Sequence, residues 1–215
     1  MKVTLQSITP QAEQNIVEIA RVSSSRKDKT AKPEGLLNYL INHKHYSPFE
    51  HAYMTLEIET SKAIGIQLIR HRSFTFQEFS QRYQDVNSLD DLFEPIEIRK
   101  QCEDNRQSST EVFDPLIEYK TGSFPASNEI NYALNACRDT YNKLIKAGVA
   151  REVARMILPM TTKTKIYMTG SLRSWIHFFD IRDSEHAQKE IQLIAQEGKE
   201  VFKKTLPIIS KALKY

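Results

Sequence analysis

Residues 51–83 read HAYMTLEIETSKAIGIQLIRHRSFTFQEFSQRY and pass from one structural pattern to another. Apolar and polar side chains alternate over residues 52–59, which predicts a half-buried strand. Ser61 follows this strand and caps a predicted helix that runs to the first arginines. The last turn of the helix carries three polar side chains on one side, namely Gln67, Arg70 and His71. A strand and a helix therefore lead directly into an arginine-rich stretch that straddles the end of the helix.

This arginine-rich stretch, residues 70–83, combines three arginines and one acid with aromatic side chains. Arg70 and Arg72 can flank one ligand where a helix end runs into extended chain. The phenylalanines supply apolar walls and the polar side chains supply hydrogen bonds, which suits a flat heterocycle that carries phosphates. A salt-bridged turn at the edge of a strand explains the same composition, so the residues alone leave both interpretations open.

Patterns on both sides of this stretch predict further strands and helices. Residues 2–8 alternate like a short strand, and the apolar residues between Ala12 and Ala20 share one helical face. The polar run over residues 23–32 ends that helix, and Pro33 begins the next one.

The C-terminal half is dominated by helical patterns. Residues 87–126 are polar, with one strand-like segment at PIEIRK, and predict a surface insert. Ser127 caps a long helix that Gly148 ends, and its inward face consists of Ile130, Leu134, Cys137, Tyr141, Leu144 and Ile145. The remaining predicted elements are a helix that stops at Pro159, a strand in KIYMT, a short helix in SLRSWIHFFDIR and a long helix from Ser184 to Lys204. The whole predicts an α+β fold: one compact domain over residues 1–215, with a small mixed or antiparallel sheet and segregated long helices.

Composition narrows the class of protein. The 215 residues are 40% hydrophobic and carry 30 basic against 27 acidic side chains, a net charge of +3. This slight excess suits an anionic ligand rather than a long polyanion, so we expect no nucleic-acid partner. Two cysteines without CxxC spacing argue against a disulfide framework. No apolar N-terminal region and no long apolar run is present, so we expect a soluble, cytoplasmic protein without a membrane partner.

Four segments resemble the flavin-dependent thymidylate synthase family. The first is RHR, seven further residues and then Ser, which are Arg70, His71, Arg72 and Ser80 here. The others are SPFEH at 47–51, GVAREVARMILP at 148–159 and RSWIHFFDIRDSEHAQ at 173–188. Together these segments extend the resemblance over nearly the whole chain, least securely over the insert.

The resemblance implies a reaction and an assembly. dUMP receives a methylene group from methylenetetrahydrofolate, and FAD that is reduced by NADPH delivers the hydride that completes dTMP. The family uses no enzyme nucleophile on the pyrimidine, which agrees with Cys137 on an inward helix face and Cys102 in a polar loop. The family also forms homotetramers in which several subunits build each site.

Site residues follow from the resemblance by position. The catalytic residue it implies is Arg182, whose permanent charge would stabilise negative charge on the uracil; the alternative is an arginine that binds last-turn carbonyls. The implied dUMP contacts are Gln67, Arg70, Glu78, Ser80, Gln81, Arg82, Arg155 and Arg182. The implied FAD contacts are Ser47, Arg70, His71, Arg72, Glu78, Ser171, Arg173 and His177. Ser171 and His177 stand where many members have asparagine, which makes these two contacts the least certain.

Other interpretations were weighed against this one. His43, His45 and His51 with Glu50 suggest zinc, but their spacing does not give four compatible ligands, so we expect no metal. No GxGxxG or GxxxxGK[ST] pattern occurs, which disfavours a dinucleotide-binding doubly wound fold. A nucleic-acid-binding module and a flavoprotein that has lost thymidylate chemistry remain as alternatives.

Overall fold

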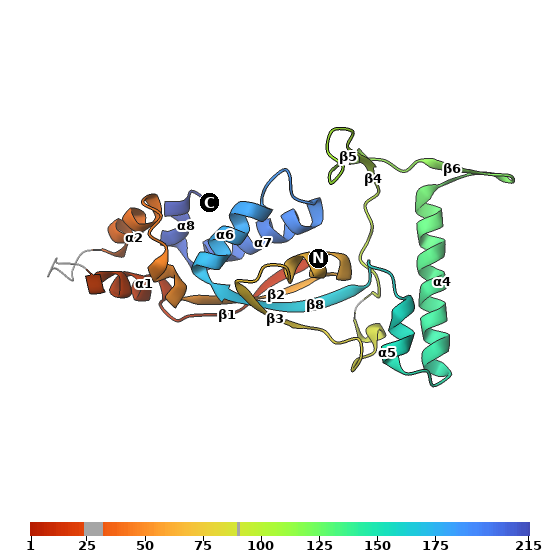
Figure 1. Cartoon of the computed structure of the whole chain (residues 1–215), viewed down its shortest axis with the longest axis horizontal. Helices are drawn as coiled ribbons and strands as arrows, with labels where there is room; N and C mark the ends of the chain where they lie inside the picture. The colour runs from red at the N-terminus through yellow and green to blue at the C-terminus, as the bar shows by residue number, and fades with distance from the viewer. Residues whose placement is uncertain (24–31, 90) are drawn as a thin grey trace. The chain divides into compact units, whose positions relative to one another are not determined.

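A computed structural model describes residues 1–23, 32–89 and 91–215 (Figure 1). The polar run expected to end the first helix lies mostly outside these residues. The chain divides into two compact units. Unit 1 consists of Met1–Glu59, Gln67–Gln77 and Ile166–Tyr215, and unit 2 of Thr60–Ile66 and Glu78–Lys165. Helices and small sheets occur without regular alternation, which confirms the predicted α+β class.

A four-stranded sheet has the order β1-β2-β8-β3. Its strands are β1 (Lys2–Ile8), β2 (Tyr53–Ser61), β8 (Lys163–Ser171) and β3 (Phe74–Glu78). β1 and β2 are antiparallel, with Val3 opposite Ile58 and a register shift between Leu5 and Ser7. Met54, Leu56 and Ile58 of β2 are buried while their neighbours are not, so the alternation predicted from the sequence is confirmed.

The helices of unit 1 enclose an aromatic core. They are α1 (Ala12–Ala20), η1 (Arg21–Ser23), α2 (Pro33–Asn42), η2 (Ser47–His51), α6 (Leu172–Arg182), α7 (Lys189–Thr205) and α8 (Pro207–Leu213). α6 and α7 lie on the same side of the sheet (Figure 1). Trp175, Phe178 and Phe179 of α6 are fully buried, and Phe179 packs edge-on against Phe202 of α7.

Two helix predictions are wrong at their ends. α3 (Lys62–Leu68) stops before Arg70 and His71, which lie in the turn that follows it. The last long helix begins at Lys189 rather than Ser184, because residues 184–188 form a turn in which Ala187 N–H donates to the Ser184 carbonyl. Turn hydrogen bonds of this kind have no signature in apolar periodicity.

Unit 2 contains a long helix and two hairpins. α4 (Ala126–Lys146) lies beside α5 (Arg151–Ala154) and η4 (Arg155–Ile157) (Figure 1). The hairpins are β4 (Arg99–Gln101) with β5 (Ser109–Val112) and β6 (Leu116–Tyr119) with β7 (Gly122–Pro125), and η3 (Val86–Ser88) precedes them. The expectation of a single strand-like segment in residues 87–126 is therefore wrong, because the two hairpins are almost wholly exposed and lack the half-buried alternation that reveals a strand.

The inward face predicted for the long helix is confirmed. Tyr141 is fully buried, and the other five residues of that face are partly buried while most of their neighbours are exposed. Gly148 has φ +83° just beyond the helix, as expected for its end. The predicted cap is wrong by two positions, because the helix begins at Ala126 with Pro125 as its N-cap, and the Ser127 backbone N–H donates to Asp114 Oδ1 at 2.9 Å.

Candidate active site

The RHR segment forms the turn between α3 and β3. Its backbone is closed by two hydrogen bonds, from His71 N–H to the Leu68 carbonyl and from Phe74 N–H to the His71 carbonyl. Arg70 and Arg72 are exposed, whereas His71 is half-buried between them. Two guanidinium groups on a short turn can reach one anionic ligand, as the sequence predicted for this helix end.

His71 joins this turn to the end of α6. Its Nε2 lies 2.9 Å from Arg182 Nε, and its ring packs edge-on against Phe178 at a centroid distance of 5.0 Å. Burial, with the positive charges of Arg182 and His177 in addition, lowers the pKa of His71 to about 4. The imidazole is therefore neutral at pH 7 and accepts the Arg182 hydrogen bond. Arg182 Nε thus binds a side chain from the RHR turn, not a last-turn carbonyl.

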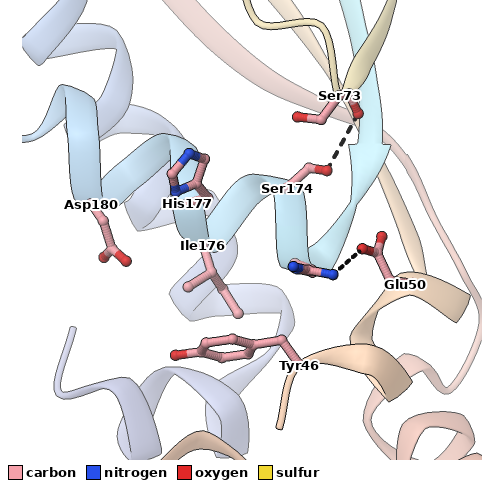
Figure 2. A pocket seen from close by; sticks show the side chains of 8 residues that line it. Tyr46, Glu50, Ser73, Ser174, Ile176, His177 and Asp180 are labelled. Carbon is pink, nitrogen blue, oxygen red and sulfur yellow. Dashed lines mark hydrogen bonds and ion pairs between the residues drawn. The ribbon is translucent and has the colours of Figure 1, made fainter. Parts of the chain in front are cut away.

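The start of α6 carries a second polar cluster, shown in Figure 2. Ser171 is buried and caps the helix, because its Oγ accepts from Ser174 N–H at 3.2 Å. Glu50 of η2 accepts from Ser171 Oγ at 2.7 Å. It also accepts from Arg173 Nη1 at 2.9 Å, the ion pair that is dashed at Glu50 in Figure 2. One carboxylate thus binds two of the residues that the resemblance assigns to FAD.

A cavity of about 470 Å³ opens beside this cluster (Figure 2). Its lining comes from η2, the RHR turn and α6, and consists of Tyr46, Glu50, Ser73, Arg173, Ser174, Ile176, His177 and Asp180. Burial raises the pKa of Asp180 above its usual value, although Lys199 and His177 oppose this. The cavity therefore combines one guanidinium, two carboxylates and several hydrogen-bonding groups with the Ile176 side chain and the Tyr46 ring, which suits part of a polar heteroaromatic ligand.

Two further predicted contacts lie in unit 1. Gln67 Nε2 donates to Gln188 Oε1, which ties the end of α3 to the N-cap of α7. Ser47 is exposed at the start of η2 and borders a separate cavity of about 350 Å³ that His45 and His51 also line.

Glu78 in unit 2 is held by two neighbours. Its Oε1 accepts from Lys62 Nζ and from Thr164 Oγ1, each at 2.7 Å. Lys62 and Glu78 are each less than one-third exposed, so their ion pair is screened less than a surface pair. The carboxylate that the resemblance places between nucleotide and flavin thus has a fixed position in its unit.

The bend after β3 contains three predicted nucleotide contacts. Tyr83 and Gln84 N–H donate to the Ser80 carbonyl, which closes the bend. Gln81 is 7% exposed, and its Nε2 has no hydrogen-bond partner within the described part of the chain. A buried amide donor without a partner is costly unless a ligand satisfies it.

Arg82 connects this bend to α5, because its Nη2 lies 3.8 Å from Glu152 Oε2. Arg155 is three residues beyond Glu152 and is partly buried. Arg151 is exposed, as its interpretation as part of a solvated face predicted. The structure therefore brings the bend near the segment that carries Arg155.

The predicted residues are shared between the two units. Unit 1 holds Ser47, Gln67, Arg70, His71, Arg72, Ser171, Arg173, His177 and Arg182. Unit 2 holds Glu78, Ser80, Gln81, Arg82 and Arg155. Within unit 1 the structure brings His71 to Arg182, but it places Arg173 and Arg182 at opposite ends of α6, nine residues apart.

Sequence reasoning missed the side chains that fix these residues. Glu50 binds Ser171 and Arg173, while Lys62 and Thr164 bind Glu78. Glu50 could have been found through its place in the SPFEH segment. Lys62 and Thr164 carry no comparable signal, because a lone lysine or threonine is an ordinary surface or strand residue.

In residues 1–23, 32–89 and 91–215, no group of three or more His, Cys, Asp or Glu side chains is placed to hold a metal ion. Over the same residues, no helix is both long and apolar enough to span a membrane. The two cysteines are free thiols in partly buried positions.

Comparisons with known proteins identify the family. Residues 4–208 match the family model described as thymidylate synthase complementing protein. A protein of Paramecium bursaria Chlorella virus 1, named probable flavin-dependent thymidylate synthase, is 44% identical over 205 residues, which cover 94% of this chain and 90% of the viral protein. The flavin-dependent thymidylate synthase of Synechocystis sp. is 38% identical over 200 residues, which cover 93% of this chain and 88% of that protein.

A solved structure supports the same conclusion. The UMP/dUMP methylase PolB of Streptomyces cacaoi, bound with 5-Br dUMP, superposes with a TM-score of 0.77 at 26% identity and covers 99% of this chain and 94% of that one. The family model spans most of the chain, and two curated relatives exceed 30% identity over nearly their whole lengths. The chain belongs to the flavin-dependent thymidylate synthase family.

Proposed function

We propose that this chain catalyses the reductive methylation of dUMP to dTMP. Methylenetetrahydrofolate supplies the carbon, and bound FAD, reduced by NADPH, supplies the hydride. Family membership supports this reaction, as does the solved relative that is described as a UMP/dUMP methylase bound with 5-Br dUMP. The alternative of a nucleic-acid-binding module has no comparable support.

The observation that carries the proposal is the unpartnered amide of Gln81. It lies between Ser80 and Arg82 in a closed bend, so a hydroxyl, an amide and a guanidinium donor follow one another. A nucleotide phosphate offers several strong acceptors and would satisfy this donor set.

The other nucleotide contacts have roles that suit their chemistry. Arg70 and Arg155 supply further guanidinium donors, and Gln67 an amide, while Glu78 is fixed by Lys62 and Thr164. Arg182 is the catalytic residue: its permanent charge stabilises the negative charge that builds on the uracil as its carbon is alkylated. Ser80 binds and does not attack, because its sequence neighbours provide no histidine base.

The flavin contacts centre on the cavity at the start of α6. Arg173 and His177 line it, and Glu50 fixes the Arg173 guanidinium, so this surface is chemically able to hold part of FAD. Ser171 is less suited to this role, because its hydroxyl hydrogen is directed to Glu50. Ser47, Arg70, His71, Arg72 and Glu78 complete the proposed flavin set.

We further propose that the active enzyme is a homotetramer. Several large apolar side chains of unit 2 are exposed, among them Met156 at 80% and Leu116 at 66%. Exposed apolar residues in such number suit burial against further copies of the chain. Light scattering on the purified protein tests this, since a monomeric mass would contradict it. The single domain over residues 1–215, the surface insert at 87–126 and the cytoplasmic location stay predictions.

The proposed reaction is tested by following the visible absorption of added FAD under anaerobic conditions. NADPH should bleach the flavin, and we expect dUMP to change the rate of bleaching. Deoxyuridine, which lacks the phosphate, is the matched control and should leave the rate unchanged. Adding methylenetetrahydrofolate to the bleached sample should give dTMP and restore the oxidised spectrum. Absence of flavin binding, or of dTMP, would overturn the proposal.

A further inference from the structure

His71 and Arg182 share a hydrogen bond whose direction is fixed by chemistry. Arg182 Nε lies 2.9 Å from His71 Nε2. An arginine Nε always carries a hydrogen and is a donor only, so His71 Nε2 must be the acceptor. The imidazole is then neutral, with its proton on Nδ1. A lowered pKa of about 4 agrees with this geometry.

The His71 ring is fixed to the core of unit 1. Phe178, which is fully buried, packs edge-on at 5.0 Å and 73°, and Phe74, 7% exposed, lies at 6.4 Å and 88°. The two backbone hydrogen bonds of the RHR turn fix the backbone of His71, to which the ring is attached. The acceptor therefore occupies a defined place that solvent does not rearrange.

A fixed acceptor limits the motion of Arg182. This residue is the last of α6, where side chains have few neighbours along the helix. The five N–H groups of a guanidinium lie in one rigid plane, so once Nε is bound the plane can turn only about that hydrogen bond. Its outer edge, formed by Nη1 and Nη2, is then directed away from His71.

We propose that His71 is the positioning residue of Arg182: its neutral imidazole holds the guanidinium in the orientation from which the outer edge stabilises charge on the pyrimidine. This role rests on the proposed function of Arg182 and is additional to the flavin contact proposed for the His71 ring, which a phenylalanine ring retains. Within the RHR motif, the arginines would bind ligand while the histidine acts through a residue 111 positions away.

The experiment compares His71→Phe and His71→Gln with the unaltered enzyme. Phenylalanine keeps an aromatic ring against Phe178 but removes the acceptor, whereas the glutamine amide oxygen can reach the place of Nε2. We expect His71→Phe to lower kcat about 10- to 100-fold, with little change in KM for dUMP or in FAD titration. His71→Gln should recover most of that loss. His43→Phe, which alters an exposed histidine of another helix end, should have no effect.

Repeating His71→Phe in an Arg182→Ala background separates positioning from an independent role. If His71 acts through Arg182, the second substitution adds no further loss of kcat. The inference is overturned if the losses multiply, if His71→Phe abolishes FAD binding, or if it leaves kcat unchanged. Near-ultraviolet circular dichroism identifies an unfolded variant, in which case the glutamine variant decides the matter: kcat near that of the unaltered enzyme supports the role, and a loss equal to that of Arg182→Ala contradicts it. An unaltered enzyme that forms no dTMP would refute the proposed function itself.

Discussion

The RHR turn of unit 1 rests on buried aromatic residues, whereas the candidate side chains Glu78 and Arg82 of unit 2 rest on ion pairs at partly exposed positions. His71 packs against Phe178, which is fully buried. Glu78 is paired with Lys62, and Arg82 lies near Glu152 at a position that is more than half exposed. The stability of apolar packing depends on side-chain volume and little on salt concentration. The stability of exposed charge pairs depends on salt concentration and little on side-chain volume. The two units should therefore respond to different perturbations.

The two units also differ in the large apolar side chains that they bury. The compact cluster of unit 2 contains five buried residues, Val86, Leu92, Phe93, Tyr141 and Ala154. In unit 1, by contrast, large side chains such as Trp175, Phe179 and Phe202 are fully buried together. Unit 1 therefore has a large interior core, while unit 2 leaves large apolar side chains such as Met156 and Leu116 exposed.

The largest effect is expected from Trp175→Ala in unit 1. The side chain is fully buried, and its Nε1 donates to the Met54 carbonyl at 2.9 Å. Its loss should lower the free energy of unfolding by about 3–5 kcal/mol, measured by urea denaturation. Tyr132→Ala on α4 is the control, since Tyr132 is 76% exposed and should change stability by less than about 0.5 kcal/mol. Equal losses at both positions would contradict the contrast between the units.

Arg182→Ala should affect chemistry rather than stability. We expect kcat for dTMP formation to fall about 10²- to 10³-fold, because a preorganised charge is removed from the site. FAD should still bind and be reduced by NADPH, which the visible spectrum reports. Arg82→Ala in unit 2 is the counterpart, and should mainly raise KM for dUMP because it removes a phosphate contact. An undiminished rate in Arg182→Ala would refute its assigned role.

Gly170→Ala tests the packing that supports the RHR turn. A Cβ at this position would lie 2.4 Å from Phe74 Cδ1, so the ring that contacts His71 would have to move. We expect a loss of about 1–3 kcal/mol in the free energy of unfolding, measured by denaturant. Gly35→Ala on α2 provides a contrast, since no atom lies within 4 Å of its added Cβ; it should stabilise the helix by about 0.5–1 kcal/mol. A neutral Gly170→Ala variant would show that unit 1 tolerates added volume.

Stability should depend on pH through His71. Its pKa is about 4 in the folded protein against 6.5 for an unperturbed histidine, mainly because of burial. Between these values the unfolded chain binds a proton that the folded chain does not, so stability falls as pH falls from about 6.5 to 4. Urea denaturation at several pH values measures this slope, and His71→Phe should reduce it. A slope that is unchanged in the variant would assign the pH dependence to other groups.

The smallest effect is expected from Glu152→Gln in unit 2. The Arg82–Glu152 distance is 3.8 Å and both side chains are more than half exposed, so the pair contributes at most about 1 kcal/mol. We expect little change in thermal stability. The dependence of KM for dUMP on salt should increase, because Arg82 then interacts with the phosphate alone. A strong loss of stability in Glu152→Gln would show that the Arg82–Glu152 pair stabilises unit 2 more than the exposure of its side chains suggests.

Much of the fold could be predicted from residue patterns. The alternation in β2 and the inward face of α4 agree with the burial of those residues, whereas in β1 only Val3 is buried and Leu5 is exposed. The missed hairpins β4–β5 and β6–β7 are almost wholly exposed, and alternation in a sequence reports burial rather than strand pairing. The ends of α3 and α7 were misplaced because turn hydrogen bonds decide them.

The sequence by itself determined the family, the α+β class and the chemical character of the site. These depend on local motifs and on side-chain periodicity, which neighbouring residues specify together. Only the tertiary structure decided which partners those residues have, such as His71 with Arg182, Glu50 with Ser171 and Lys62 with Glu78. The first two pairs join residues more than 100 positions apart. Local sequence patterns do not reveal such pairs, because their residues meet only when whole helices and strands pack together.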